Sequence, residues 1–320
     1  MRSTAELGRG PAGRPGFISG LTEQTLAGMA RRKVLLAYLF LLPTILGILI
    51  FTAGPVIVSL GLSLFAWDVI NPAEFVGLAN YQRLVSDPQV WTSFANTAKF
   101  VVFAVSLQLT LAFLLALGVQ RKGMPTGLRY FFRSAFFLPV LTSAASISIV
   151  LAYLFNKEFG VINYYLGRIG IPPVPWLNSS EWALITVALA YVWQQIGFTF
   201  IVFVGGLGNL PKEVLEAAEV DGAAGWRRLW NVTLPLMSPT ILFAAVVGVI
   251  NALQVFAEPF IMTHGGPGDA SRTVVLTLYE AAFKNLELGY GSAIAMVLFI
   301  VIMLVTAGQF WIGNRLVFYQ

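Results

Sequence analysis

Long apolar runs dominate this chain of 320 residues, and alternation of polar and apolar positions is rare. A helix needs about 20 residues to cross a bilayer core. Six runs without a charged residue are at least that long: 34–67, 100–120, 134–156, 182–211, 229–257 and 288–314. Backbone groups in lipid must pair within the chain, so we expect each run to be helical. The pattern predicts an all-α, polytopic membrane protein with six transmembrane helices.

The composition agrees with this fold class. The chain is 57% hydrophobic and 11% charged, whereas an average soluble domain is about a quarter charged. It has no cysteine, which excludes disulfides, thiolate metal sites and cysteine nucleophiles. We expect the lone His264 to be a loop residue and not a metal ligand, because no ligand set lies near it in the sequence.

The basic residues predict the orientation in the membrane. With six spans, both termini lie on one side, together with the loops 121–133 and 206–228. Cytoplasmic loops carry an excess of Lys and Arg, so this side is predicted to be the cytoplasm of a multi-pass cell-membrane protein. The net charge of +5 then reflects topology and does not call for nucleic acid. Fourteen of the 20 basic residues fall on this side: Arg2, Arg9, Arg14, Arg31, Arg32, Lys33, Arg121, Lys122, Arg129, Arg133, Lys212, Arg227, Arg228 and Arg315.

Two regions differ in composition. Residues 1–33 are rich in Gly, Pro, Ser and Thr with scattered Arg, and are predicted to be a disordered cytoplasmic tail. Residues 34–320 are predicted to form one transmembrane domain, with the charged loop at about 206–235 inside it.

The 206–235 loop contains the sequence KEVLEAAEVDGAAGWRRLW, which predicts two short helices. Pro211 suits a first helical position, Glu213 suits the first turn, and Asp221-Gly222 suits a helix stop. A solvated loop that only keeps charge out of the bilayer is one interpretation. A compact helical face that fits a groove on another protein is the other.

A family resemblance favours the second interpretation. Glu216-Ala217-Ala218, then Asp221-Gly222-Ala223 and Val232-Thr233-Leu234-Pro235, resemble the EAA loop of ABC importer permeases. The resemblance implies a coupling helix that docks on a separate ATPase through Glu216, Ala217, Ala218, Asp221 and Gly222. It also implies no enzyme activity and no cofactor on this chain, with ATP and Mg on the partner ATPase. The chain indeed lacks a phosphate-binding GxxxxGK[ST] loop.

The segment 251–283 resembles carbohydrate permeases of the maltose and glycerol-phosphate type. Thr263, Gly265-Gly266-Pro267 and Tyr279 fit the TxGGP and TLxxYxxxAF pattern of that branch. The resemblance implies a permease subunit of an ATP-driven sugar importer. Its partners would be a second permease, two ATPase subunits and an extracellular or periplasmic sugar-binding protein. The large outward insertion of the maltose member is absent.

Polar residues inside the apolar runs are candidates for the substrate path. On a continuous helix Asn251, Gln254 and Glu258 would lie within about 60° of one another. They could contact sugar hydroxyls or close a helix interface. The resemblance favours substrate contact at Asn251 and Gln254. In the fourth run Tyr191 and Gln194, with Trp193 and Gln195, could add one face to the site.

Two other functions remain open from the residues alone. A secondary transporter or channel subunit would work without an ATPase and would favour an ion relay or an inverted repeat. A structural membrane scaffold would show no dependence on a ligand. The sequence does not identify the sugar.

Overall fold

The structure is a computed structural model that describes residues 34, 36–68, 70–121 and 123–317. The predicted tail 1–33 therefore lies outside the described residues, as do its basic residues and Lys122. The chain divides into two units, 1–58 and 59–320. A helix of the first unit continues through a π-helical turn, Leu49–Ala53, into α2 (Gly54–Leu62), whose last residues belong to the second unit. The stretch Leu36–Leu62 is apolar and long enough to cross a membrane.

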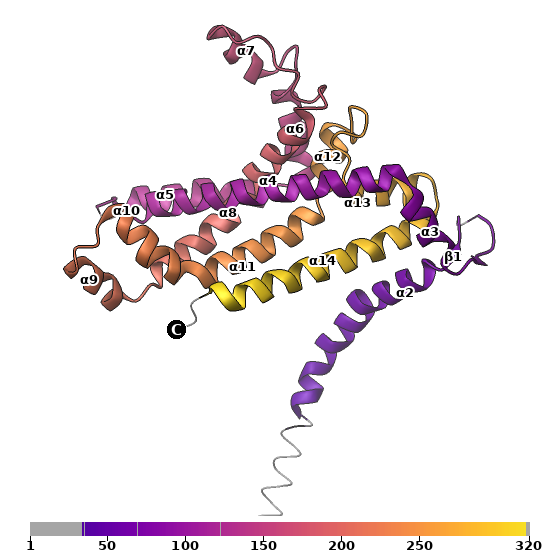
Figure 1. Cartoon of the computed structure of the whole chain (residues 1–320), viewed down its shortest axis with the longest axis horizontal. Coiled ribbons are helices and arrows are strands. Elements are labelled where there is room, and N and C mark those ends of the chain that lie inside the picture. The colour runs from indigo at the N-terminus through magenta and orange to yellow at the C-terminus, as the bar shows by residue number, and fades with distance from the viewer. Residues whose placement is uncertain (1–33, 35, 69, 122, 318–320) are drawn as a thin grey trace, which may run out of the picture. The chain divides into compact units, whose positions relative to one another are not determined.

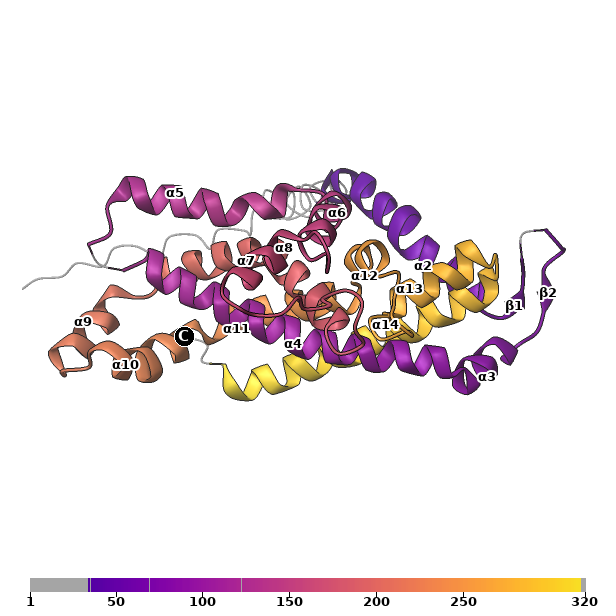
Figure 2. The same ribbon diagram turned by 90° about the horizontal axis from the view of Figure 1, so that it is seen from above.

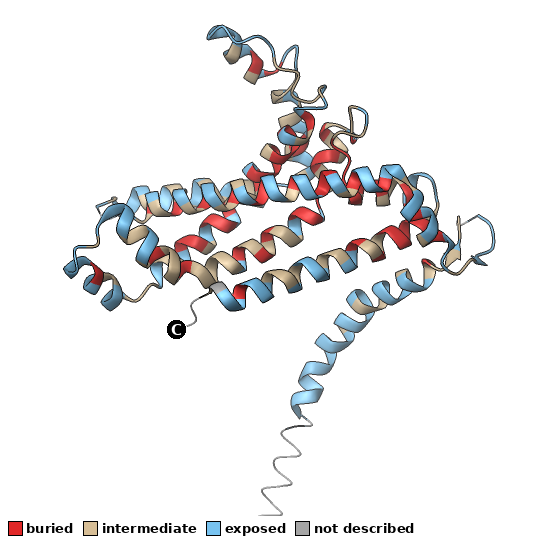
Figure 3. Ribbon diagram, in the orientation of Figure 1, coloured by how far each residue is buried: buried red, intermediate tan, exposed pale blue. Residues whose placement is uncertain are grey.

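Four long helices form the body of the second unit. They lie side by side in Figures 1 and 2, with α4 against α8 and α11, and α11 against α14. Large side chains such as Phe100, Phe200 and Met237 are fully buried between them. Figure 3 shows the buried positions along α8 and at the start of α14, while α5 carries none. The four helices are α4 (Pro88–Val119), α8 (Ala183–Gly208), α11 (Leu234–Leu253) and α14 (Leu288–Leu316).

The helix α4 starts twelve residues before the predicted run at 100. Asp87 caps it: its carboxylate accepts a hydrogen bond from the backbone N–H of Gln89 at 2.9 Å, and Pro88 occupies the first turn. This cap and proline are standard helix-start signals. A search for charge-free runs stops at Lys99, which lies inside this helix.

The third predicted span is not one straight helix, so the prediction of a single helix over 134–156 is wrong. Its two parts, α5 (Thr126–Phe137) and α6 (Ala144–Leu154), are bent by 100° around a 3₁₀ turn at Leu138–Leu141. The 3₁₀ turn contains Pro139, and Thr142 is extended. Proline removes a helical hydrogen-bond donor, which favours a break here.

The fifth predicted span also breaks. The chain runs from α10 (Gly225–Arg228) through a π-helical turn, Leu229–Thr233, into α11, which ends at Leu253. A short helix, α12 (Ala257–Met262), follows after an irregular step. In an uninterrupted helix the ring of Pro259 would clash with the carbonyl of Val255. The expectation of continuous helix through residue 257 is therefore wrong at its outer end.

The remaining elements are short. At the end away from α9 (Lys212–Val220) and α10 in Figure 1, β1 (Phe65–Ala66) pairs antiparallel with β2 (Glu74–Phe75), and α3 (Ala79–Ser86) follows. The connections also hold α7 (Val161–Arg168), α13 (Val274–Tyr279) and a π-helical segment, Glu280–Lys284. Within the described residues five helices are long and apolar enough to cross a membrane, or six if the bent pair is one span. The all-α, polytopic prediction is confirmed.

Candidate functional site

A pocket of about 380 Å³ opens where α11 gives way to α12, and we call it the helix-break pocket. It contains all five residues that the sequence indicated for a substrate path. Its lining residues are Ala144, Tyr191, Gln194, Gln195, Asn251, Gln254, Val255, Phe256, Ala257 and Glu258. Three chain segments meet there: the start of α6, the middle of α8, and the break between α11 and α12.

The α8 wall of the pocket is buried and fixed. Tyr191 and Gln194 are both buried, and the Tyr191 ring packs edge to face on Phe100 with centroids 5.3 Å apart. Gln194 donates from Nε2 to the backbone carbonyl of Thr142 at 3.2 Å. A side chain that lines the pocket therefore also holds the bend between α5 and α6.

The opposite wall is the helix break. Asn251 and Gln254 are exposed, and the Gln254 amide donates to the carbonyl of Ile250 at 3.1 Å. Glu258 is buried, with 5% of its surface exposed. The common helical arc expected for the three residues does not exist, because α11 ends at Leu253. The break itself brings the three side chains to one pocket.

Aromatic rings extend outward from the pocket. Phe256 stacks on Phe260 with centroids 5.0 Å apart and planes within 15°. Tyr279 packs against both, at 4.9 Å from Phe256 and 5.3 Å from Phe260. Such offset contacts stabilise beyond simple burial of area. They keep the short helix α12 in place beside α13.

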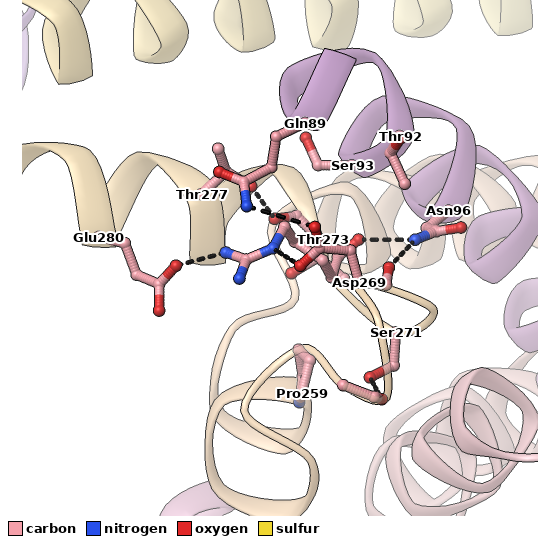
Figure 4. Close-up of polar contacts among 12 residues, drawn as sticks. Gln89, Thr92, Ser93, Asn96, Pro259, Asp269, Ser271, Thr273, Thr277 and Glu280 are labelled. Atoms are coloured by element: carbon pink, nitrogen blue, oxygen red, sulfur yellow. Dashed lines mark hydrogen bonds and ion pairs between the residues drawn. The ribbon is translucent and has the colours of Figure 1, made fainter. Parts of the chain in front are cut away.

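The loop after α12 is held on α4 and on the pocket backbone (Figure 4). The Asn96 side chain on α4 donates to the carbonyls of Asp269 at 2.7 Å and Arg272 at 3.2 Å. Thr273 donates from its hydroxyl to the carbonyl of Val255 at 3.1 Å. Because Pro259, four residues further on, has no N–H, the carbonyl of Val255 has no helical donor, and the Thr273 hydroxyl satisfies it instead.

An ion cluster fixes the same loop. Arg272 is 8% exposed and pairs with Asp269 at 2.5 Å and with Glu280, which also pairs with Lys284 at 3.2 Å. Burial alone would raise the pKa of Asp269, but the hydrogen bonds from Arg272 and Gln89 outweigh it and lower that pKa. The pKa of Glu280 is likewise lowered, because Arg272 and Lys284 outweigh burial.

The 206–235 loop projects from the end of the bundle where α14 ends (Figures 1 and 2). Its first helix, α9 (Lys212–Val220), begins one residue after the expected Pro211. The expected stop is confirmed: Gly222 has φ +75°, and the next amide, of Ala223, donates to the carbonyl of Ala218 at 2.8 Å. This is the Schellman pattern, in which glycine favours the left-handed residue.

The docking residues implied by the resemblance lie mostly on the surface. Glu216, Ala217, Asp221 and Gly222 are exposed, whereas Ala218 is buried. The buried alanine therefore supports the loop from inside and does not itself face outward.

Apolar side chains beside these residues are unusually exposed. Val220 is 88% exposed, Trp226 is 70% exposed, and Trp230 packs on Trp226 at 5.6 Å. We call these three residues the tryptophan patch. Arg228 lies 3.8 Å from Glu219 and links the two helices of the loop. Clustered exposed apolar residues, tryptophan above all, are typical of protein interfaces.

Comparison with known families gives the class of the protein. Residues 108–317, more than half of the chain, match the family described as binding-protein-dependent transport system inner membrane component. The chain belongs to this family. As a binding-protein-dependent permease it is the membrane component of a transport system, and its several apolar helices agree with a multi-pass membrane protein.

The permease has curated relatives along most of its length. It is 34% identical to the sulfoquinovosyl glycerol permease SmoG of Agrobacterium fabrum, over 85% of this chain and 88% of that protein. It is 34% identical to the sn-glycerol-3-phosphate permease UgpA of the same species, over 89% and 97%. With the lactose permease LacF of Rhizobium radiobacter it shares 32% identity, over 87% and 94%.

Solved structures confirm the fold of the permease. A chain of a bacterial ABC transporter that imports the acidic polysaccharide alginate superposes with a TM-score of 0.78 at 23% identity, covering 91% of this chain and 99% of that chain. A second structure of an alginate transporter, in complex with its substrate-bound periplasmic protein, also gives a TM-score of 0.78.

Of the two other fourth-run residues that the sequence indicated, Gln195 also lines the helix-break pocket, while Trp193 lies in a separate apolar pocket against α5. Sequence reasoning missed two residues that support the pocket. Thr142 and Thr273 hold the pocket through their contacts with Gln194 and Val255. Nothing in the sequence near either threonine indicates these contacts, which are made by segments distant along the chain.

Proposed function

We propose that this chain is the membrane-spanning permease subunit of an ATP-driven sugar importer. The observation that carries the proposal is the helix-break pocket. It presents amide, hydroxyl and carboxyl groups next to the ring of Phe256. Sugars offer many hydroxyls as donors and acceptors together with weakly apolar ring faces, and such a lining matches both. Asn251, Gln254, Glu258, Tyr191 and Gln194 are the proposed contacts.

The 206–235 loop is the proposed connection to the energy source. Its exposed residues Glu216, Ala217, Asp221 and Gly222, with the tryptophan patch alongside, suit a groove on a separate ATPase. ATP and Mg would bind on that partner. A second permease, a second ATPase copy and an extracellular sugar-binding protein would complete the importer.

The proposed orientation places this loop and the C-terminus in the cytoplasm. Seven basic residues among those described fall on the segments at this end: Arg121, Arg129, Arg133, Lys212, Arg227, Arg228 and Arg315. The tight turn after α12 and the β1–β2 pair would then face outward, where a loaded binding protein arrives. Delivery of the substrate from outside by a binding protein supports import and not export.

The names of the relatives support a carbohydrate or polyol as cargo but do not fix its charge. One is named for a glycerol phosphate and another for lactose, at 34% and 32% identity. Because the two sequence identities are so similar, they do not favour either named substrate. The charge of the cargo must therefore be inferred from the chemistry of the pocket.

Reconstitution tests the proposal. The permease would be co-expressed with the proposed second permease, ATPase and binding protein, purified, and placed in liposomes. Sugar uptake that needs the binding protein and internal ATP, and ignores ion gradients, is the expected result. Uptake driven by a proton or sodium gradient without ATPase would favour a secondary transporter instead.

A further inference from the structure

We propose that the helix-break pocket passes uncharged or positively charged saccharides and discriminates against those that carry a carboxylate, sulfonate or phosphate. This inference rests on the proposed function, because it assigns a substrate class to the same pocket.

The charge of the pocket lining is the first observation. Glu258, at the start of α12, contributes a carboxyl group to the lining, and 5% of the surface of this residue is exposed. The other polar side chains there are neutral: one phenol and four amides, from Tyr191, Gln194, Gln195, Asn251 and Gln254. Among the ten lining residues, all of them described, none is Lys, Arg or His.

The position of Glu258 is the second observation. Its neighbour Pro259 accepts hydrogen bonds at its carbonyl from Thr263 at 2.9 Å and from the backbone N–H of Gly265 at 3.2 Å. On the other side, Val255 is tied to Thr273. The backbone that carries Glu258 is thus held at both flanks, which keeps this residue at the pocket.

Electrostatics then sets the preference. If Glu258 is ionised, an anionic sugar meets a like charge at low dielectric, which costs several-fold more than it would in water. If Glu258 is protonated, the anion leaves water without any opposite charge to replace its hydration. Both protonation states penalise the anion. A neutral sugar can satisfy the carboxyl and amide groups with its hydroxyls, and an amino sugar can also pair with the carboxylate.

Hydrogen bonding adds a reason to expect neutral polyols. Asn251 and Gln254 are both exposed. The side-chain amide of Gln254 uses one donor, in its hydrogen bond to the carbonyl of Ile250. Each amide offers both donor and acceptor groups. Hydroxyl groups also act as both, whereas a carboxylate only accepts, so an acid group in place of a hydroxyl removes one donor that could pair with the acceptor oxygens of the pocket.

The test compares three matched probes that differ in one group: methyl β-glucoside, its 6-carboxylate methyl β-glucuronide, and the amino sugar methyl β-glucosaminide, with the galacto series in parallel. Binding constants at pH 7 would be measured by saturation-transfer NMR on the assembled importer in nanodiscs, without the binding protein. We expect the uronides to bind at least about tenfold more weakly than the neutral glycosides, and the amino sugars to bind no more weakly than these.

Glu258→Gln provides the variant and Glu181→Gln, an exposed carboxylate outside the pocket, the matched control. The glucuronide penalty should shrink in Glu258→Gln if the carboxyl group is ionised and should persist if it is protonated, because loss of hydration then remains the cost; in Glu181→Gln it should stay unchanged. Uronides that bind the wild type as tightly as the neutral glycosides, or a penalty that shrinks equally in the two variants, would overturn this inference and leave the sugar importer standing. Failure of every probe to bind would overturn the assignment of the pocket to sugar, and this inference with it.

Discussion

The side-chain amide of Gln194, on α8, donates a hydrogen bond of 3.2 Å to the backbone carbonyl of Thr142. Thr142 lies at the bend of 100° between α5 and α6. The carbonyl belongs to the irregular turn and has lost its helical partner. One face of Gln194 lines the helix-break pocket. The contents of the pocket and the geometry of the bend are therefore linked through a single side chain.

Gln194→Ala should destabilise the bend. Loss of this part-buried hydrogen bond should cost about 0.5 to 1.5 kcal/mol. The matched control is Gln195→Ala, which alters the same pocket one residue further along. We expect a clearly lower melting temperature for the first variant in detergent. Equal melting temperatures for the two would show that the Gln194 bond does not hold the bend.

Gly222→Leu should uncouple the permease from its ATPase. A left-handed residue other than glycine costs about 1 to 2 kcal/mol, and the new side chain would project from an exposed turn. Gly170→Leu is the matched control, because Gly170 has φ +81° and the same open surroundings but lies in the loop between α7 and α8. Affinity purification should recover less ATPase with Gly222→Leu only. Normal recovery would remove this turn from the interface.

The Arg272 cluster should make stability depend on acid pH. The folded-state pKa values of Asp269 and Glu280 are lowered from their ordinary values of 3.8 and 4.5. The stabilisation is present above those ordinary values and is lost as pH falls through the lowered ones. The melting temperature should therefore hold from pH 7 to about pH 5 and fall below about pH 4.

Arg272→Gln should remove most of that dependence. At pH 7 it should also destabilise the protein by about 2 kcal/mol, because buried acceptors lose a charged donor. The exposed Lys157→Gln serves as control and should change neither the melting temperature nor its pH profile. An acid profile that is the same in Arg272→Gln as in the wild type would place the acid-sensitive groups elsewhere.

The predicted orientation can be tested with single cysteines, because the chain has none. The substitutions would be Ser180→Cys and Ala224→Cys. Both positions are exposed; Ser180 lies just before α8, and Ala224 lies in the loop after it. An impermeant thiol reagent should label the first in intact cells and the second only after the membrane is opened. Ser271 is unsuitable as an outer probe, since it is fully buried. The reverse labelling pattern would invert the topology.

The sequence was sufficient for the fold class and for most of the spans. The runs at 182–211 and 288–314 match α8 and α14 closely, because uninterrupted apolar sequence leaves helix as the economical structure in lipid. The search failed where a charge lies within a helix, as Lys99 does in α4. It also failed inside the run 134–156, where Pro139 lies in a 3₁₀ turn, and at the end of the run 229–257, where α11 ends at Leu253 shortly before Pro259.

For the candidate site too, the sequence indicated residues but not their arrangement. Amides and a carboxyl in an apolar run identified Asn251, Gln254 and Glu258 as candidates, because such groups are costly in a membrane. Their arrangement was derived from a regular helix that the structure interrupts. The contacts of Thr142 and Thr273 depend on chain segments 52 and 18 residues away, and no local pattern predicts such pairings.

Sugar transport by the importer with Asn251→Ala and Gln254→Ala, singly and together, tests the central claim most directly. Each lost hydrogen bond costs about 0.5 to 1.5 kcal/mol, so each single variant should lower ATP-dependent uptake into liposomes by about threefold to tenfold. The complexes should still assemble and hydrolyse ATP in the presence of the loaded binding protein. Phe243→Ala, an exposed apolar position on α11 outside the pocket, is the control. Wild-type uptake by the double variant would contradict the claim that sugar passes through the helix-break pocket.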